Sequence, residues 1–116
     1  LVVDDEKLER DGIRFLLSME EGEWEIYEAA NGKLALNELR KHPVDLMLTD
    51  IKMPHMDGLE ATRLIRSYSK EVPIVALTAF AFESDKDRAI EAGCDDFLTK
   101  PVSQNALEKV LDKYVK

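Results

Sequence analysis

Short aliphatic runs alternate along the chain with longer segments in which apolar residues recur at helical spacing. The runs cover residues 1–3, 24–29, 44–49, 73–78 and 96–99, and the second of them alternates only partly. Continuous runs are typical of strands buried on both faces, whereas partial alternation is typical of an exposed edge strand. A helical segment follows each run, so the pattern predicts five β–α units.

In most of the helical segments the apolar residues line one face of the helix, and we expect this face to point toward the sheet. In the first, we expect this face to consist of Leu8, Gly12, Phe15, Leu16 and Met19, with Ile13 and Leu17 widening it. Gly12 costs about 1 kcal/mol in helix propensity, which predicts that it allows a close approach to the sheet. In the later helices we expect Asp57 and Ser103 as N-caps and, as inward residues, Ala35, Leu36 and Leu39, then Ala61, Leu64, Ile65 and Tyr68, and finally Leu107, Val110, Leu111 and Tyr114.

Strands that alternate with helices require a parallel sheet covered on both faces, with right-handed crossovers. We therefore expect an α/β fold, a doubly wound five-stranded parallel sheet of the (βα)5 type with the flavodoxin-like strand order 2-1-3-4-5. The 116 residues suit a single domain, and no internal repeat or linker divides them. Because the chain begins within the first predicted strand and without an initiator Met, we expect residues 1–116 to be part of a longer chain.

The charge and composition exclude several classes of function. The chain has 24 acidic and 16 basic residues, and its net charge of −8 repels phosphate backbones and anionic lipid surfaces. The single cysteine, Cys94, excludes an internal disulfide and a cysteine-based zinc site. The longest nearly apolar stretch, residues 74–82, is far below the ~20 residues that span a bilayer. We expect no direct contact with nucleic acid or membrane, and a cytoplasmic location even where the parent protein is membrane-anchored.

Polar side chains stand directly after four of the five predicted strands: Asp4 and Asp5, Asp50, Thr78, and Lys100. The working crevice of an open parallel sheet lies beyond the carboxyl ends of its strands, so we expect these residues to gather there. Three carboxylates in one crevice repel one another, and oxygen ligands without His or Cys select a hard ion such as Mg²⁺. The plainer alternative is that Asp4 and Asp5 only cap the first helix.

A metal, carboxylates, a hydroxyl and an ammonium around one crevice describe a phosphoryl-transfer site. The motifs that carry this chemistry are Asp4-Asp5, Asp50, Met53-Pro54 with Met56-Asp57-Gly58, Thr78-Ala79 and Lys100-Pro101. In order and spacing they resemble the receiver domain of two-component response regulators, and the match runs from end to end. Residues 56–63 are more similar to receivers fused to hybrid sensor histidine kinases than to those of DNA-binding regulators.

The resemblance implies a role for each matching residue. Asp50 corresponds to the phosphoacceptor, Thr78 to the hydroxyl that follows the phosphoryl group, and Lys100 to the lysine that pairs with it. The implied magnesium ligands are the carboxylates of Asp5 and Asp50, the backbone carbonyl of Lys52 and, through water, Asp4.

The resemblance also implies a conformational switch. Phe97 occupies a position that is often Tyr in the family, and it would turn inward when Thr78 moves toward the phosphoryl group. A repacking of the helix at residues 84–93 would follow. Ala79, Phe80 and Pro101 would flank the site, and the Lys100–Pro101 peptide would be cis.

The implied partner is a sensor histidine kinase or a histidine phosphotransfer domain, whose phosphohistidine would supply the phosphoryl group. It would dock on the face of the first helix that carries Arg10, Asp11 and Arg14, although the plainer interpretation is that these three are solvated. The last helices would offer a surface for a homodimer. Apart from self-catalysed phosphotransfer and slow autodephosphorylation, we expect no enzymatic activity.

Three other interpretations are weighed against this one. An FMN-binding protein of the same fold needs a phosphate-binding loop after the first strand, where Asp4-Asp5-Glu6 would repel a phosphate. A phosphatase of the haloacid dehalogenase type needs a second Asp two residues after Asp50, and position 52 is Lys. A receiver-like module that binds proteins without phosphorylation stays open as the main alternative.

Overall fold

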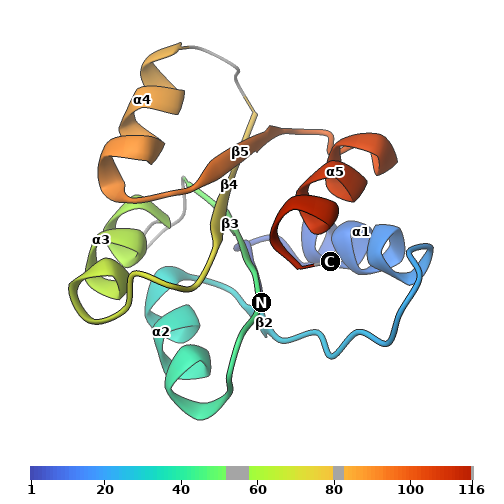
Figure 1. The fold of residues 1–116 in the computed structure, drawn as a ribbon, viewed down its shortest axis with the longest axis horizontal. Helices are drawn as coiled ribbons and strands as arrows, with labels where there is room; N and C mark the ends of the chain where they lie inside the picture. The colour runs from blue at the N-terminus through green and yellow to red at the C-terminus, as the bar shows by residue number, and fades with distance from the viewer. Residues whose placement is uncertain (52–57, 80–82, 116) are drawn as a thin grey trace.

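The computed structural model describes residues 1–51, 58–79 and 83–115, without the side chains of Tyr68 and of residues 83–85. Strands and helices alternate along the chain, as Figure 1 shows. In chain order the elements are β1 (Val2–Val3), α1 (Lys7–Ser18), β2 (Glu28–Ala29), α2 (Gly32–Lys41), β3 (Met47–Asp50), α3 (Gly58–Tyr68), β4 (Ile74–Thr78), α4 (Glu83–Ala92), β5 (Asp96–Thr99) and α5 (Gln104–Tyr114).

The five strands pair in parallel in the order β2-β1-β3-β4-β5, which confirms the predicted fold and strand order. The register brings the strand ends level, because Val3 pairs with Thr49 and Asp50 pairs with Leu77. The residues that follow these pairs therefore leave the sheet along one edge. β2 is shorter than the predicted residues 24–29, since at the sheet margin it pairs only with the two residues of β1.

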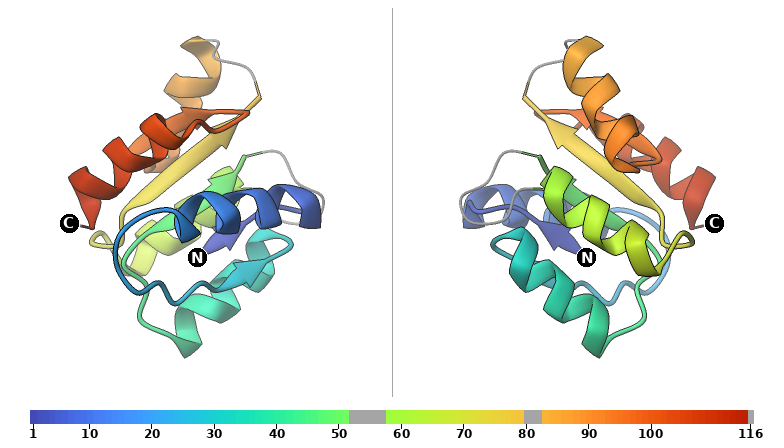
Figure 2. Two further views of the ribbon diagram at one scale, coloured as in Figure 1. Left: turned by 90° about the vertical axis from the view of Figure 1, so that its right-hand side faces the viewer. Right: turned by 90° about the vertical axis from the view of Figure 1, so that its left-hand side faces the viewer.

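Helices cover both faces of the sheet. Figures 1 and 2 show α2, α3 and α4 on one face, and α1 and α5 on the other. Successive side chains of a strand point to opposite faces, so Met47 joins the core under the first group and Leu48 the core under the second. Burial on both faces fixes the strands in place, and with them the residues at their carboxyl ends.

The predicted inward face of α1 is only partly correct, because Leu16 packs against the core beside Ile13 and Leu17 but the other expected residues do not. Ile13 and Leu17 are buried against the sheet, whereas Leu8, Phe15 and Met19 have exposed fractions of 84%, 65% and 54%. Apolar residues lie on two sides of this helix, so their spacing predicts a helix but does not decide which side meets the sheet. The exposed side of α1 is therefore an apolar surface.

The predicted faces of the other helices are mostly correct. Ala35, Ala61, Ile65, Leu107, Val110 and Leu111 are all buried. In α3, however, Leu64 is partly exposed, and Leu59 and Thr62 are buried instead. Ser103 caps α5 through its hydroxyl, which accepts a hydrogen bond from the amide of Ala106 at 3.1 Å. Asp57 and the side chain of Tyr68 lie outside the described residues.

The expected close approach at Gly12 is also wrong, and it occurs at Gly58 instead. A Cβ atom placed on Gly12 would have no heavy atom within 4 Å beyond its own helix and chain neighbours. A Cβ placed on Gly58 would overlap the backbone oxygen of Asp50 and come within 2.9 Å of the Thr49 hydroxyl. The start of α3 can lie against the end of β3 only because residue 58 has no side chain.

Across the described residues, no helix is both long and apolar enough to cross a bilayer.

Candidate functional site

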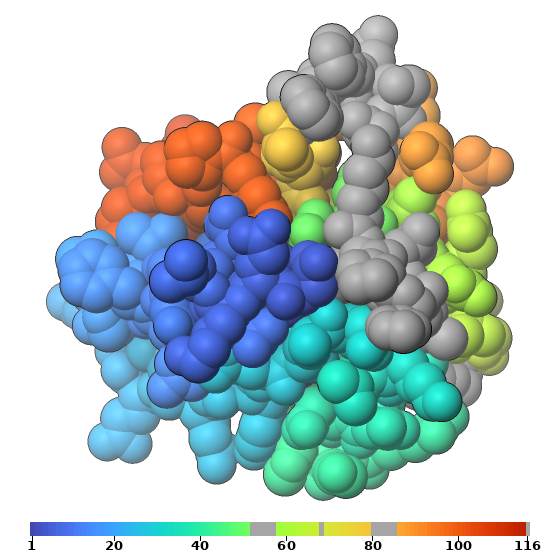
Figure 3. All heavy atoms as spheres, turned by 180° about the vertical axis from the view of Figure 1, so that it is seen from behind, coloured from blue at the N-terminus to red at the C-terminus, as the bar shows by residue number. Residues whose placement is uncertain are grey.

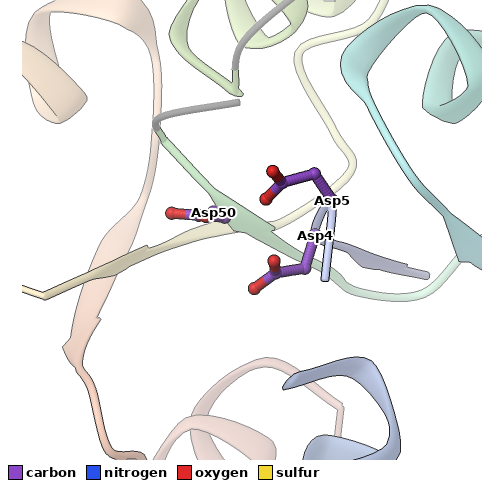
Figure 4. Close-up of side chains that lie close together, drawn as sticks. All are labelled: Asp4, Asp5 and Asp50. Carbon is purple, nitrogen blue, oxygen red and sulfur yellow. The ribbon is translucent and has the colours of Figure 1, made fainter. Parts of the chain in front are cut away.

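Three carboxylates meet at the carboxyl edge of the sheet. Asp4 and Asp5 follow β1, and Asp50 ends β3, the strand beside it. One oxygen of each lies within 4.8 Å of the others, the only such group of potential metal ligands among the described residues. Figure 4 shows the three side chains pointing to the same side. The parallel register, rather than proximity in sequence, brings position 50 to positions 4 and 5.

Asp4 is the buried member of the group and is held from several sides. Its side chain is 2% exposed. One carboxylate oxygen accepts a hydrogen bond from the amide of Glu6 at 3.0 Å, and the other accepts one from Lys100 Nζ at 2.8 Å. Its own amide donates to the carbonyl of Ala29 on β2 at 3.0 Å. Asp5, in contrast, is exposed at the mouth of the site.

Lys100 carries the positive charge of the site. Its Nζ lies 2.8 Å from Asp4 Oδ2 and 3.4 Å from Asp50 Oδ2. Burial by itself would lower the pKa of Lys100, but the hydrogen bond to Asp4 and the charges of Asp50 and Asp4 outweigh it, so the pKa is raised. The lysine therefore stays charged, and it offsets one of the three negative charges around it.

Thr78 and the residues after β5 complete this edge. Thr78 ends β4, is 5% exposed, and accepts a hydrogen bond at its backbone oxygen from the amide of Lys100 at 2.7 Å. The Lys100–Pro101 peptide is cis, as the resemblance to receiver domains implies. Ala79 and Pro101 are exposed beside the site. Two of the expected site residues, Lys52 and Phe80, lie outside the described part of the chain.

Phe97 lies on β5, partly buried against the core under α2, α3 and α4. The ammonium of Lys86, on α4, lies 4.5 Å from the centre of its ring. This cation–π contact links the aromatic side chain to the helix that covers it. The residue at the predicted switch position is thus in contact with the element that is expected to move.

Two residues that shape the site were not predicted from the sequence. Arg10, expected to be solvated, has a side chain only 16% exposed and donates a hydrogen bond to the carbonyl of Asp4 at 2.7 Å. Gly58 lets α3 begin directly against the backbone of Asp50. Neither carries a local signal, because the partner of Arg10 on β2 is 18 residues away and the contact of Gly58 depends on how α3 enters the fold.

A cleft of about 260 Å³ adjoins the site. It lies between α1 and the segment after β5, and its walls include Gly12, Phe15, Leu16, Lys100 and Pro101. In Figure 3 the blue start of the chain, the green end of β3 and the orange segment after β5 meet on one face of the molecule. The exposed apolar side of α1 therefore borders the same edge as the acidic group.

Comparison with known proteins finds one family. The sequence pattern of the response regulator receiver domain matches residues 1–112. The two-component response regulator ORR41 of Oryza sativa subsp. japonica is 41% identical over 116 residues, which cover 98% of this chain and 91% of that protein. Three other curated relatives are sensor histidine kinases, of whose length the chain spans only 10–12%.

Solved structures agree with this result. The receiver domain of Ssk1 from Saccharomyces cerevisiae, crystallised with the histidine phosphotransfer protein Ypd1, has a TM-score of 0.87 at 30% identity, covering 97% of this chain and 85% of that one. The receiver domain of the sensor histidine kinase PA1611 from Pseudomonas aeruginosa, with magnesium coordinated in its active-site cleft, also has a TM-score of 0.87 at 30% identity, covering 97% and 93%. The chain belongs to the family of response regulator receiver domains, which are phosphoacceptor switches of phosphorelay signalling rather than enzymes in the ordinary sense.

Proposed function

We propose that Asp50 of this chain accepts a phosphoryl group from a phosphohistidine. A carboxylate oxygen of Asp50 attacks the phosphorus, the phosphorus–nitrogen bond breaks, and its electron pair stays on the imidazole nitrogen of the donor. The observation that carries the proposal is the convergence of Asp4, Asp5 and Asp50 within 4.8 Å, with Lys100 only 3.4 Å from Asp50. The three carboxylates carry more negative charge than the single ammonium of Lys100 offsets. An anionic phosphoryl group can therefore approach Asp50 only when a metal cation is also bound.

The donor set fits magnesium. Two oxygens on one Mg²⁺ lie at most about 4.2 Å apart, because the metal–oxygen distance is about 2.1 Å. The 4.8 Å limit within the group is close to this, and the exposed Asp5 side chain has room to adjust. Both oxygens of Asp4 already accept hydrogen bonds, which suits contact through water. We assign direct binding to Asp5, Asp50 and the backbone carbonyl of Lys52; bound magnesium would supply charge neutralisation at the transferring group.

Lys100 and Thr78 are assigned to the phosphoryl oxygens. The ammonium of Lys100 would exchange part of its interaction with Asp50 for an oxygen of the new phosphoryl group. The Thr78 hydroxyl, at the end of the neighbouring strand, would donate a hydrogen bond to another oxygen. The product, an acyl phosphate, would hydrolyse slowly by itself and return the domain to its starting state.

The switch is assigned to Thr78, Phe97 and α4. Movement of Thr78 toward the phosphoryl group would make space for the Phe97 ring, which has no hydroxyl and so acts by packing alone. α4 is weakly anchored, because Ala89 and Ala92 are its buried apolar residues and Ile90 is 59% exposed. An element with so little buried apolar surface can change its packing at small cost.

The donor is assigned to the exposed apolar side of α1 rather than to the expected face with Arg10, Asp11 and Arg14, because both arginines of that face already pair with Glu28. Leu8, Phe15 and Met19 form a stripe of exposed large side chains, and the cleft beside Phe15 reaches Lys100 and Pro101. A helical donor lying along this stripe would bring its histidine to the edge where Asp50 stands. We propose a sensor histidine kinase or a histidine phosphotransfer domain as this donor, the full 1–116 range as the receiver unit, and α4 and α5 as the surface for a homodimer.

The test is phosphorylation in solution. Incubated with Mg²⁺ and acetyl phosphate or a phosphohistidine donor, the wild type should gain the mass of one phosphoryl group, and EDTA or Asp50→Asn should abolish the gain. Asp45→Asn is the matched control, because Asp45 is exposed and lies outside the acidic group. A wild type that gains no mass from either donor would instead support a module that binds proteins without phosphorylation.

A further inference from the structure

We propose that Arg10 is a positioning residue for the acidic site: its guanidinium fixes the turn after β1 and so aims Asp5 toward Asp50. The inference rests on the proposed function, because it concerns the affinity of the same site for Mg²⁺. Arg10 touches none of the three carboxylates in the structure. Its effect is exerted through the backbone of the turn.

The contacts of Arg10 join three elements. From α1, its Nη1 donates to the backbone oxygen of Asp4 at 2.7 Å, and its Nε donates to Glu28 Oε1 on β2 at 3.2 Å. The side chain is 16% exposed, so these hydrogen bonds are largely shielded from water. Val2 of β1 pairs with Glu28, which means that the guanidinium anchors the end of β1 to the strand beside it.

The Asp5 carboxylate depends on this anchor more than its neighbours do. Lys100 and the amide of Glu6 hold the Asp4 carboxylate, and Lys100 lies beside Asp50. Within the described ranges, no hydrogen bond or ion pair holds the carboxylate of Asp5, which is exposed. The peptide that joins Asp5 to Asp4 sets the direction in which the Asp5 side chain leaves the backbone, and Arg10 binds the carbonyl oxygen of that peptide.

Arg14 offers a matched control. It lies one turn further along α1 and also pairs with Glu28, through Oε2 at 3.1 Å. Its side chain is 46% exposed and makes no hydrogen bond to the turn after β1 in the described structure. Replacing Arg10 or Arg14 by Met removes one positive charge from the same helix, but only the first change removes the contact with Asp4.

The sign of the effect separates positioning from electrostatics. Removing a positive charge near a metal site favours the bound cation, so charge alone predicts that Arg10→Met and Arg14→Met both bind Mg²⁺ more tightly. Positioning predicts that Arg10→Met binds it more weakly. Loss of a group that orients a metal ligand typically costs 10–100-fold in affinity, and we expect the lower end, ~10-fold, because Arg10 acts through the backbone.

The experiment is isothermal titration of the folded 116-residue chain with MgCl₂, comparing wild type with Arg10→Met, Arg14→Met and Arg10→Lys. We expect ~10-fold weaker binding for Arg10→Met and unchanged or tighter binding for Arg14→Met. We expect partial recovery for Arg10→Lys, which keeps the charge and a single donor nitrogen but not the planar fork. Where Arg10→Met does not fold, Arg10→Lys should still bind Mg²⁺ severalfold more weakly than the wild type, whereas charge alone predicts no change for this charge-preserving variant.

The outcomes separate this inference from the proposal on which it rests. Arg10→Met that binds Mg²⁺ as tightly as the wild type, or more tightly, overturns the positioning role and leaves the phosphoacceptor proposal intact. Equal weakening in both arginine variants also overturns it, because a general effect on α1 would then be the cause. A wild type that binds no Mg²⁺ overturns the proposed metal site itself.

Discussion

The interaction of Lys100 with Asp4 gives the sharpest quantitative prediction. In Lys100→Met, a side chain of similar length keeps the packing but leaves Asp4, 2% exposed, without its cation. Removing one partner of a buried ion pair costs about 3–5 kcal/mol. Asp4 keeps its hydrogen bond from the amide of Glu6, and the site opens to water at Asp5. We therefore expect the lower end, a loss of about 3 kcal/mol in the free energy of unfolding, when no divalent cation is present.

Magnesium should reverse part of this loss. Removing the ammonium relieves a repulsion of order 1–2 kcal/mol with a divalent ion in the same site, so Lys100→Met should bind Mg²⁺ about tenfold more tightly. At saturation this adds about 1.4 kcal/mol of stability relative to the wild type, which reduces the deficit to roughly half. Asp4→Asn in the same chain should also reduce the deficit, because no buried charge is then left unpaired.

The assay is urea unfolding of wild type and Lys100→Met, in EDTA and in saturating MgCl₂. Lys109→Met is the matched control, because Lys109 lies on the exposed side of α5 and should change stability by less than about 0.5 kcal/mol. The reasoning is refuted when Lys100→Met is as stable as the wild type in EDTA, or when Mg²⁺ stabilises both proteins equally.

Three further predictions concern other parts of the molecule. Gly12→Ala should stabilise the fold by about 0.5–1 kcal/mol, because the added methyl group meets no neighbouring atom. Gly58→Ala should destabilise the fold and lower the affinity for Mg²⁺, because its methyl group would overlap the backbone of Asp50. Urea unfolding that finds Gly58→Ala more stable than Gly12→Ala would contradict the assigned contacts. Phe15→Ala should slow phosphoryl transfer from a phosphohistidine protein severalfold but leave labelling by acetyl phosphate unchanged; equal loss with both donors would exclude α1 docking. In the chain with a free amino terminus, burial lowers the pKa of the Leu1 amino group from 8.0 to about 6, although the negative charge of Asp45 acts to raise it. The unfolded chain then binds more protons between pH 6 and 8, so unfolding free energy should rise with pH by up to about 2.7 kcal/mol, and acetylation of the amine should remove the slope.

The fold and the gathering of the acidic residues follow from the sequence for one reason. Continuous apolar runs separated by helices require a parallel sheet, and a parallel sheet places the ends of its strands along one edge. Asp4 and Lys100 are 96 residues apart, yet their positions directly after two such runs are enough to predict that they meet. The order and direction of the strands are therefore enough to predict this contact.

The side of α1 that faces the sheet could not be predicted in the same way. Both Ile13 with Leu17 and Leu8 with Phe15 lie at helical spacing, and either pair would satisfy the apolar periodicity. The choice is made by how the helix packs between β1 and α5, which local spacing does not contain. The surplus apolar side is then left on the surface, where a partner can use it.

The orienting role of Arg10 and the need for glycine at position 58 were also beyond the sequence. An arginine on a polar helix face is ordinarily solvated, and its contact with the Asp4 carbonyl exists only because α1 crosses the end of β1. Gly58 lies in a helix that starts against Asp50, whereas Gly12, the more conspicuous glycine, lies mid-helix and meets nothing. In both cases the tertiary contact, rather than the residue type, determines the role.

The most direct measurement locates the phosphoryl group itself. Borohydride reduces an aspartyl phosphate to homoserine, so the chain can be phosphorylated in Mg²⁺, reduced, digested and sequenced by mass spectrometry. The proposed chemistry predicts homoserine at position 50 alone, and none when EDTA is added before the phosphoryl donor. Homoserine at position 4, 5 or 57 in place of 50, or the same yield without a divalent cation, would contradict it.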